Sequence, residues 1–195
     1  MHIADINFPN FYAPAFRCLA DAETFCASVE SLGGPVPAKT ALHQGARMLW
    51  LADRMDEVAR GRDALQILFY LIAAEAVAKI VFCFNGEGES KKHVKLFFGQ
   101  VCTEKHRALL SRAFFQPLSG FVTWERAVEK LYEVRCDVVH EGRYFEFNLR
   151  LPGSTVPELT DASAQGLEAY ISSADLKQLV LEGVVEGVRR LLPPT

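Results

Sequence analysis

The chain has 195 residues, half of them apolar and 23% charged, with a formal net charge of −3. This composition excludes a disordered protein, because fourteen phenylalanines and the other apolar residues can bury enough surface to support folding. The length suits a single domain spanning 1–195, and the first ten residues carry Asp5 and no apolar core segment, so we expect no signal peptide.

The cysteines are odd in number and form no C-x-x-C pair, which argues against both a disulfide framework and a zinc site. We therefore predict buried thiols in a reducing, cytoplasmic setting, with no metal and no cofactor. The five cysteines are Cys18, Cys26, Cys83, Cys102 and Cys136.

The N-terminal third is expected to hold an arm and two helices. Residues 1–13 contain Pro9 among several aromatics and are predicted to form an extended arm. Apolar residues at helical spacing predict a helix over 15–32, which ends at 33–35, Gly-Gly-Pro. A second helix is predicted over 38–60.

The segment 62–84 is apolar on almost every side, which is typical of a helix buried within a bundle. A membrane span is disfavoured, because Glu75 and Lys79 lie inside it and each would cost about 2.5–3.5 kcal/mol at a bilayer centre. The two residues are four positions apart and can pair. We favour that pairing over the alternative, in which Glu75 reaches across the bundle and holds Arg135 through a bidentate contact.

Two shorter helices are predicted over 90–100 and 103–114, followed by a turn at 116–120. His93 and His106 lie in these helices among lysines and arginines. No cysteine or carboxylate stands at metal-ligand spacing from them. We therefore predict that both histidines are surface residues.

The segment 123–142 shows apolar residues at three- and four-residue steps, which predicts a helix with one buried face. Thr123 suits the N-cap and Gly142 suits the stop. Arg135 and His140 stand near its C-terminal end, five positions apart. Five residues turn an α-helix through about 500°, so these side chains are expected to project roughly 140° apart.

Spacing alone leaves an ordinary alternative for both residues. Arg135 would be a solvated side chain facing Glu133 or Asp137. His140 would be a cation near the negative end of the helix dipole.

After this helix the pattern changes. Residues 144–151 alternate apolar and polar side chains, which predicts a strand. A loop of about ten residues then reaches Asp161. The last helix is predicted over 172–192, with Ser172 and Asp175 forming a capping box.

Together these elements predict a mainly all-α fold. We expect an antiparallel up-and-down helical bundle with core helices over 62–142. A small β excursion over 143–171 would precede the last helix, leaning on the bundle or on a partner chain.

Charge is distributed unevenly along the chain. Residues 91–150 hold eleven Lys/Arg against seven Asp/Glu, a surplus of four, while the remainder holds ten against seventeen, a deficit of seven. A phosphate-rich partner would prefer the segment that contains Arg135 and His140. Solvated lysines would produce the same count, so this asymmetry alone is not decisive.

The segment 131–142 resembles the signature helix of the HEPN superfamily, whose mark is R-x4–6-H. The form Arg-Cys-Asp-Val-Val-His-Glu-Gly at 135–142 is closest to the Apea-like HEPN pattern, although Glu141 separates the histidine from the glycine. The helix that holds Glu75 also resembles the early core helix of that family. The resemblance covers roughly 62–150.

This resemblance implies the same helical fold, usually as a homodimer with the two motif helices close together. It implies a metal-independent endoribonuclease in which Arg135 and His140 act on RNA, leaving a 2′,3′-cyclic phosphate and a 5′-hydroxyl. It also implies a toxin or defence component that an inhibitor or antitoxin protein holds in check.

The sequence departs from the family pattern in two places. Many members carry Asn, Asp, Ser or His directly after the arginine, where this chain has Cys136. A toxin branch carries a tyrosine two residues after the histidine, where this chain has Gly142, so that tyrosine is not carried over to Tyr144. Residues that could support the site are Cys136, Asp137, Glu75, Tyr132 and Tyr144.

Two other functions stay open. The domain could bind a nucleotide, a nucleic acid or a protein without cutting, which allows His140 to be exposed without turnover. It could instead be a structural helical dimerisation module, in which Arg135 and His140 are both paired and covered.

Overall fold

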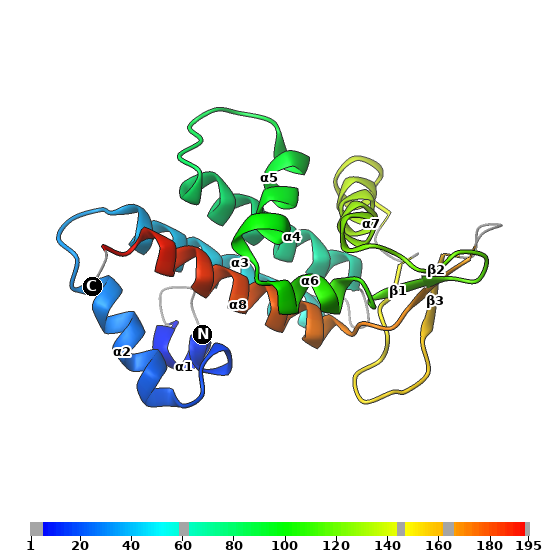
Figure 1. The fold of residues 1–195 in the computed structure, drawn as a ribbon, viewed down its shortest axis with the longest axis horizontal. Coiled ribbons are helices and arrows are strands. Elements are labelled where there is room, and N and C mark those ends of the chain that lie inside the picture. The colour runs from blue at the N-terminus through cyan, green and yellow to red at the C-terminus, as the bar shows by residue number, and fades with distance from the viewer. Residues whose placement is uncertain (1–5, 59–62, 144–146, 162–165, 194–195) are drawn as a thin grey trace.

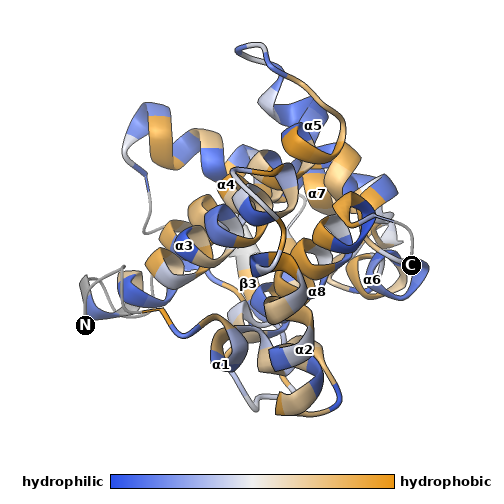
Figure 2. Ribbon diagram, turned by 90° about the vertical axis from the view of Figure 1, so that its left-hand side faces the viewer, coloured by the Kyte–Doolittle hydropathy of each residue, from blue (hydrophilic) through white to orange (hydrophobic). Residues whose placement is uncertain are grey.

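The computed structural model describes residues 6–58, 63–143, 147–161 and 166–193. The chain is mainly helical with a small antiparallel sheet, as predicted (Figure 1). Three long helices, α3 (Pro37–Val58), α4 (Asp63–Val81) and α8 (Ser173–Leu191), pack against one another and build the core. Apolar residues gather where the helices meet, whereas polar residues line the outer turns (Figure 2).

Helix α4 is the central element of this core. It is the one helix of the described residues that is long and apolar enough to cross a membrane, yet it packs between α3 and α8 inside the bundle. Close approach is possible because α8 carries Gly187, where an added Cβ would lie 2.5 Å from the Cγ1 atom of Val77. The prediction of a core helix is confirmed.

The N-terminal arm is not fully extended. Phe8–Tyr12 forms α1, and a 3-10 turn continues it over Ala13–Ala15. The extended-arm prediction is wrong here because Pro9 lies in the first turn, where its missing N–H costs nothing. Buried Tyr12 then donates a hydrogen bond of 2.6 Å to the Leu42 carbonyl. Helix α2 (Leu19–Glu30) follows and lies with α1 at the opposite end of the molecule from the sheet (Figure 1).

The middle of the chain forms short helices around α4. Helix α5 (Ser90–Leu96) widens into a π-helix over Phe97–Val101, and α6 (Glu104–Leu110) follows. Both histidines predicted at the surface are buried, which corrects that prediction. His93 contacts the Phe84 ring and the Glu89 carbonyl. The Nε2 atom of His106 lies 2.7 Å from Glu182 on α8.

The sheet has the strand order β2-β1-β4-β3 and is antiparallel throughout. Two of its strands, β3 and β4, lie in the β excursion predicted over 143–171, whereas β1 and β2 lie in segments predicted to be helix end and turn. The strands are only two to four residues long, too short to show the alternation that predicts a strand. Their bounds are β1 Phe114–Gln116, β2 Gly120–Phe121, β3 Glu158–Asp161 and β4 Leu167–Ala169.

The strand predicted over 144–151 is not formed in its described part, residues 147–151, apart from an isolated bridge between Arg150 and Ser172. Side chains hold this segment in place of a strand ladder. The Leu149 N–H donates to the Asp63 carboxylate at 2.6 Å.

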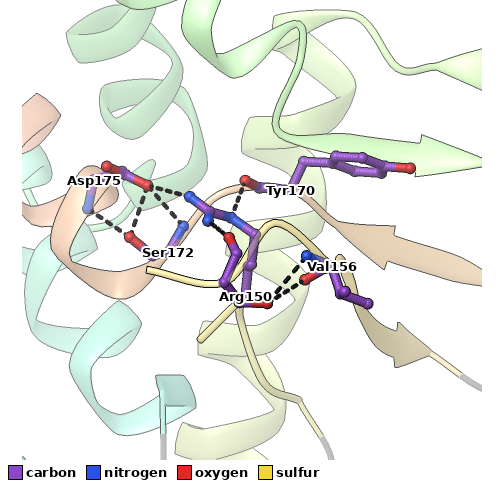
Figure 3. Close-up of polar contacts among 6 residues, drawn as sticks. Arg150, Val156, Tyr170, Ser172 and Asp175 are labelled. Carbon is purple, nitrogen blue, oxygen red and sulfur yellow. Dashed lines mark hydrogen bonds and ion pairs between the residues drawn. The ribbon is translucent and has the colours of Figure 1, made fainter. Parts of the chain in front are cut away.

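Arg150 ties this segment to the start of α8 (Figure 3). Its guanidinium donates to the Tyr170 carbonyl at 2.7 Å, to the Ser154 carbonyl and to Asp175 at 3.1 Å. Burial opposes ionisation of Asp175, but hydrogen bonds from Ser172 together with the Arg150 charge hold the pKa of that carboxyl below its usual value. The predicted capping box of Ser172 and Asp175 is confirmed.

Candidate functional site

The candidate site lies at the C-terminal end of α7 (Trp124–Cys136). The helix begins as predicted, with the Thr123 hydroxyl accepting a hydrogen bond from the Arg126 N–H. Its last turn differs from the prediction, because a π-helix runs over Asp137–Glu141. Gly142 ends this turn at a φ of 65°, a conformation that favours glycine, and its N–H donates to the Asp137 carbonyl.

The π-helical turn changes the expected geometry of the motif. Hydrogen bonds in it join residues five apart, so each residue turns through a smaller angle than in an α-helix. The offset of about 140° between Arg135 and His140 applies to a regular α-helix. A turn widened over Asp137–Glu141 brings positions five apart toward one face. Single π turns within α-helices are frequent at functional sites.

Arg135 is half-buried and has no carboxylate partner among the described residues. Its guanidinium carbon lies 5.4 Å from the centre of the Tyr132 ring, which is a cation–π contact. Within the described part of the chain, its side chain makes no hydrogen bond or ion pair. The two acids that the ordinary alternative offered are engaged elsewhere: Asp137 with Arg143 at 3.2 Å, and Glu133 with two other cations. Arg135 is therefore held by an aromatic ring and keeps its donors available.

The other cations of α7 show how unusual this is. Arg126 pairs with Glu129 at 3.1 Å, and Lys130 pairs with Glu133 at 2.9 Å. Hydrogen bonds from Lys95 and Arg126 lower the pKa of Glu129 to about 2. Of the three cations of α7, Arg135 is the one without an acidic partner in the part of the chain that the structure describes.

His140 is exposed within the π turn. Neither ring nitrogen contacts another residue in the described ranges, so both are available to exchange protons. Its neighbour Val139 is 48% exposed. The structural-module alternative expects both motif residues to be covered and paired, and the single chain shows neither for His140.

Only some of the predicted supporting residues lie close to Arg135. Tyr132 contacts Arg135, and Cys136 is half-buried beside it. Glu75 binds Lys79 at 2.7 Å and accepts a hydrogen bond from Ser90 at 2.8 Å, so the favoured pairing is confirmed. The alternative contact between Glu75 and Arg135 is absent among the described residues, because that carboxylate faces α5. Tyr144 lies outside the described residues.

The cysteines are all free, as predicted, but not all buried. Cys18 and Cys83 are exposed and Cys136 is half-buried, so the prediction of burial is confirmed for Cys26 and Cys102 and wrong for the other three. Burial, together with nearby Glu30, raises the pKa of Cys26 to about 11. In the described ranges, no three side chains of His, Cys, Asp or Glu are grouped so that they could hold a metal ion.

Comparisons with protein-family models, curated proteins and solved structures find no match for this chain. Membership of the HEPN superfamily therefore stays a prediction, carried by the sequence motif.

Proposed function

We propose that this protein is a metal-independent endoribonuclease of the HEPN type, in which Arg135 and His140 act on an RNA phosphate. The proposal rests on one observation: the motif helix ends with an exposed histidine and an arginine that has no acidic partner. A buried structural role would require hydrogen-bond partners for both side chains. Here the donors and the proton-exchange group are both available.

The reaction needs three tasks. A base takes the proton of the ribose 2′-hydroxyl while its oxygen attacks the adjacent phosphorus. An acid gives a proton to the departing 5′-oxygen as the P–O5′ bond breaks, which leaves a 2′,3′-cyclic phosphate and a 5′-hydroxyl. Histidine suits both proton transfers, because its ordinary pKa of about 6.5 lies near neutrality. Arg135 would donate two hydrogen bonds to the phosphate oxygens that gain charge.

Two copies of the chain would complete the site. One His140 cannot be base and acid in the same step, so the second role falls to His140 of another copy. His140 and its neighbour Val139 are both exposed in the single chain, so a second copy could reach them. The proposal therefore includes a homodimer with the two motif helices facing each other.

The biological setting follows from the resemblance. An uninhibited ribonuclease would cleave the RNA of its own cell. We therefore propose a cytoplasmic toxin or defence component whose active site is covered by an inhibitor protein. A domain that binds nucleotide, nucleic acid or protein without cutting is the second candidate, because exposure of His140 supports binding as well as turnover.

The test is cleavage of a mixed RNA pool in the presence of EDTA. Wild type is compared with His140→Ala, and both are first matched in dimer mass and melting temperature. We expect wild type to leave cyclic-phosphate ends and the variant to cleave about 10²- to 10⁴-fold more slowly, the usual contribution of general acid–base catalysis. A folded wild-type dimer that cleaves no RNA would reject the nuclease and leave the binding domain.

A further inference from the structure

A second surface feature lies away from the motif, where α6 faces the start of α8. It is a groove with a volume of about 480 Å³. Buried Ala113 and Ile171 lie among its lining residues. Charged and aromatic side chains join them, namely Lys105, Arg112, Arg150, Tyr170 and Asp175.

The cations that line the groove outnumber the carboxylates that pair with them. Arg150 is bound to Asp175 and to the Tyr170 carbonyl, so these charges are satisfied within the fold (Figure 3). Arg112 is exposed, and its guanidinium makes no hydrogen bond or ion pair with any described residue. The Lys105 side chain is 76% exposed, and its nearest carboxylate, Glu182, is 4.0 Å away. Two cations are therefore available at the groove.

Glu182 already contacts His106 and Gln178, so its interaction with Lys105 is weak. Its carboxylate lies 2.7 Å from the Nε2 atom of His106 and accepts a hydrogen bond from Gln178 at 2.8 Å. Burial opposes ionisation, but these hydrogen bonds keep the pKa of Glu182 below its usual value, so it stays ionised near neutrality.

Tyr170 is the aromatic residue among those that line the groove, and both its backbone and its ring are held in place. Its N–H donates to the Ala113 carbonyl at 2.8 Å, and its carbonyl accepts from Arg150. Its ring contacts the Phe121 ring edge-on, with centres 5.3 Å apart. Its hydroxyl donates to Glu168 at 3.3 Å. In Figure 3 the ring points away from Arg150 and Asp175, which also line the groove.

We infer that this groove binds one nucleotide of single-stranded RNA, with the base against Tyr170 and the phosphate on Arg112 and Lys105. Single-strand binding combines an aromatic surface with cations that follow the backbone, which is the combination found here. The volume lies within the range of small-molecule sites, about 300–1,000 Å³. Available cations favour a polyanion over an apolar protein segment.

The inference rests on the proposed ribonuclease function and adds a substrate-holding site to it. Helix α6 packs on α7, and β2 ends just before the Thr123 cap of α7. The groove therefore lies beside the element that carries His140. The path along α7 and its π turn is about 25 Å at 1.5 Å per residue, so only an RNA of several nucleotides would reach both sites.

The experiment measures RNA binding in the His140→Ala protein, so that cleavage cannot intervene. The probe is a fluorescent single-stranded RNA of about 16 nucleotides, the upper end of known single-strand site sizes. Arg112→Ala should weaken binding and reduce the slope of log K against log salt by about 0.7, one phosphate contact on a single strand. Arg47→Ala, an exposed arginine on α3 outside the groove, is the matched control and should bind as the parent does.

The contribution of the Tyr170 ring to RNA binding is tested by a second pair of variants. Tyr170→Phe keeps the ring and should retain binding, whereas Tyr170→Leu should weaken it roughly 5- to 100-fold through lost stacking. If Tyr170→Leu fails to fold, Arg112→Ala still tests the groove, because Arg112 is exposed and its replacement should not disturb the fold.

The outcomes separate the two proposals. If Arg112→Ala and Tyr170→Leu bind RNA as well as Arg47→Ala does, the groove is not an RNA site, whatever the nuclease result. Groove-dependent binding by a wild type that never cleaves would uphold the groove and reject the nuclease. If the groove variants instead change the oligomeric mass with no effect on RNA, the groove is a contact between copies and the inference fails. If neither the His140→Ala parent nor any variant binds RNA, the groove inference fails, and the cleavage assay of wild type alone decides the nuclease.

Discussion

His106 and His140 both lie in helical segments near basic residues, and they differ in how their ring nitrogens are occupied. His106 is 3% exposed; its Nδ1 accepts the Thr103 N–H and its Nε2 faces Glu182 at 2.7 Å. His140 is exposed, with neither nitrogen engaged in the described ranges. The comparison teaches that the availability of the two nitrogens, and not the residue type or its basic neighbours, separates a structural histidine from a candidate catalytic one.

After that of His140→Ala, the largest expected effect on RNA cleavage is that of replacing Arg135. Replacement by alanine should slow RNA cleavage by about 10²- to 10³-fold, the usual cost of one preorganised donor to a developing negative charge. Stability should change little, because this guanidinium makes only a cation–π contact. The measurement is the cleavage rate together with the melting temperature. Arg126→Ala, on the same helix but paired with Glu129, is the control and should keep its activity.

The histidine comparison predicts opposite losses for the two residues. His106→Ala should lower the free energy of unfolding by about 1–3 kcal/mol, because it leaves buried partners without their hydrogen bonds. His140→Ala should leave the free energy of unfolding unchanged. Urea denaturation of both variants measures this difference. Equal destabilisation by the two substitutions would contradict the distinction drawn here.

The π turn can be perturbed at its end. Gly142→Ala places a side chain at a φ of 65° with open space around it, so the expected cost is conformational, about 1 kcal/mol. Cleavage should fall further than stability does, because the turn that carries His140 is altered. Gly34→Ala is the matched control, with a φ of 71° and equally open surroundings. It should show the same loss of stability and full activity.

The smallest effect is a pH dependence of stability that comes from Glu182, the partner of His106. The pKa of Glu182 is lower in the folded state than its unfolded value of 4.5. Ionised Glu182 therefore stabilises the fold at every pH above 4.5, and this contribution is lost as the pH falls through the folded pKa. Wild type should therefore lose more stability than Glu182→Gln between neutral pH and about pH 3. Denaturation at several pH values measures the difference, and parallel profiles would show that the His106–Glu182 contact adds nothing.

Most helices could be predicted because their signals are local. Apolar spacing marks α3 and α8, the uniformly apolar segment marks α4, and the caps at Thr123 and Ser172 lie beside the turns they begin. Arg135 and His140 were also identified from a short local pattern. These features need no knowledge of distant residues.

The rest depends on partners far along the chain. His106 was predicted at the surface because its partner, Glu182, lies 76 positions away. The sheet joins β1 to β4 across about fifty residues, and no short strand of it shows its own alternation. The groove gathers Arg112 and Tyr170 from the two sides of that pairing, so no sequence motif could have marked it.

The sequence by itself determined the helical character, the core role of α4 and the position of the arginine–histidine motif, because periodicity and capping act within a few residues. Only the tertiary structure decided that the motif helix ends in a π turn, that Arg135 rests on Tyr132 without an acidic partner, and that His106 is saturated while His140 is not. The physical reason is that a polar side chain's availability depends on which distant groups reach it first. The packing of distant segments, and not the local sequence pattern, therefore decides which polar side chains stay available.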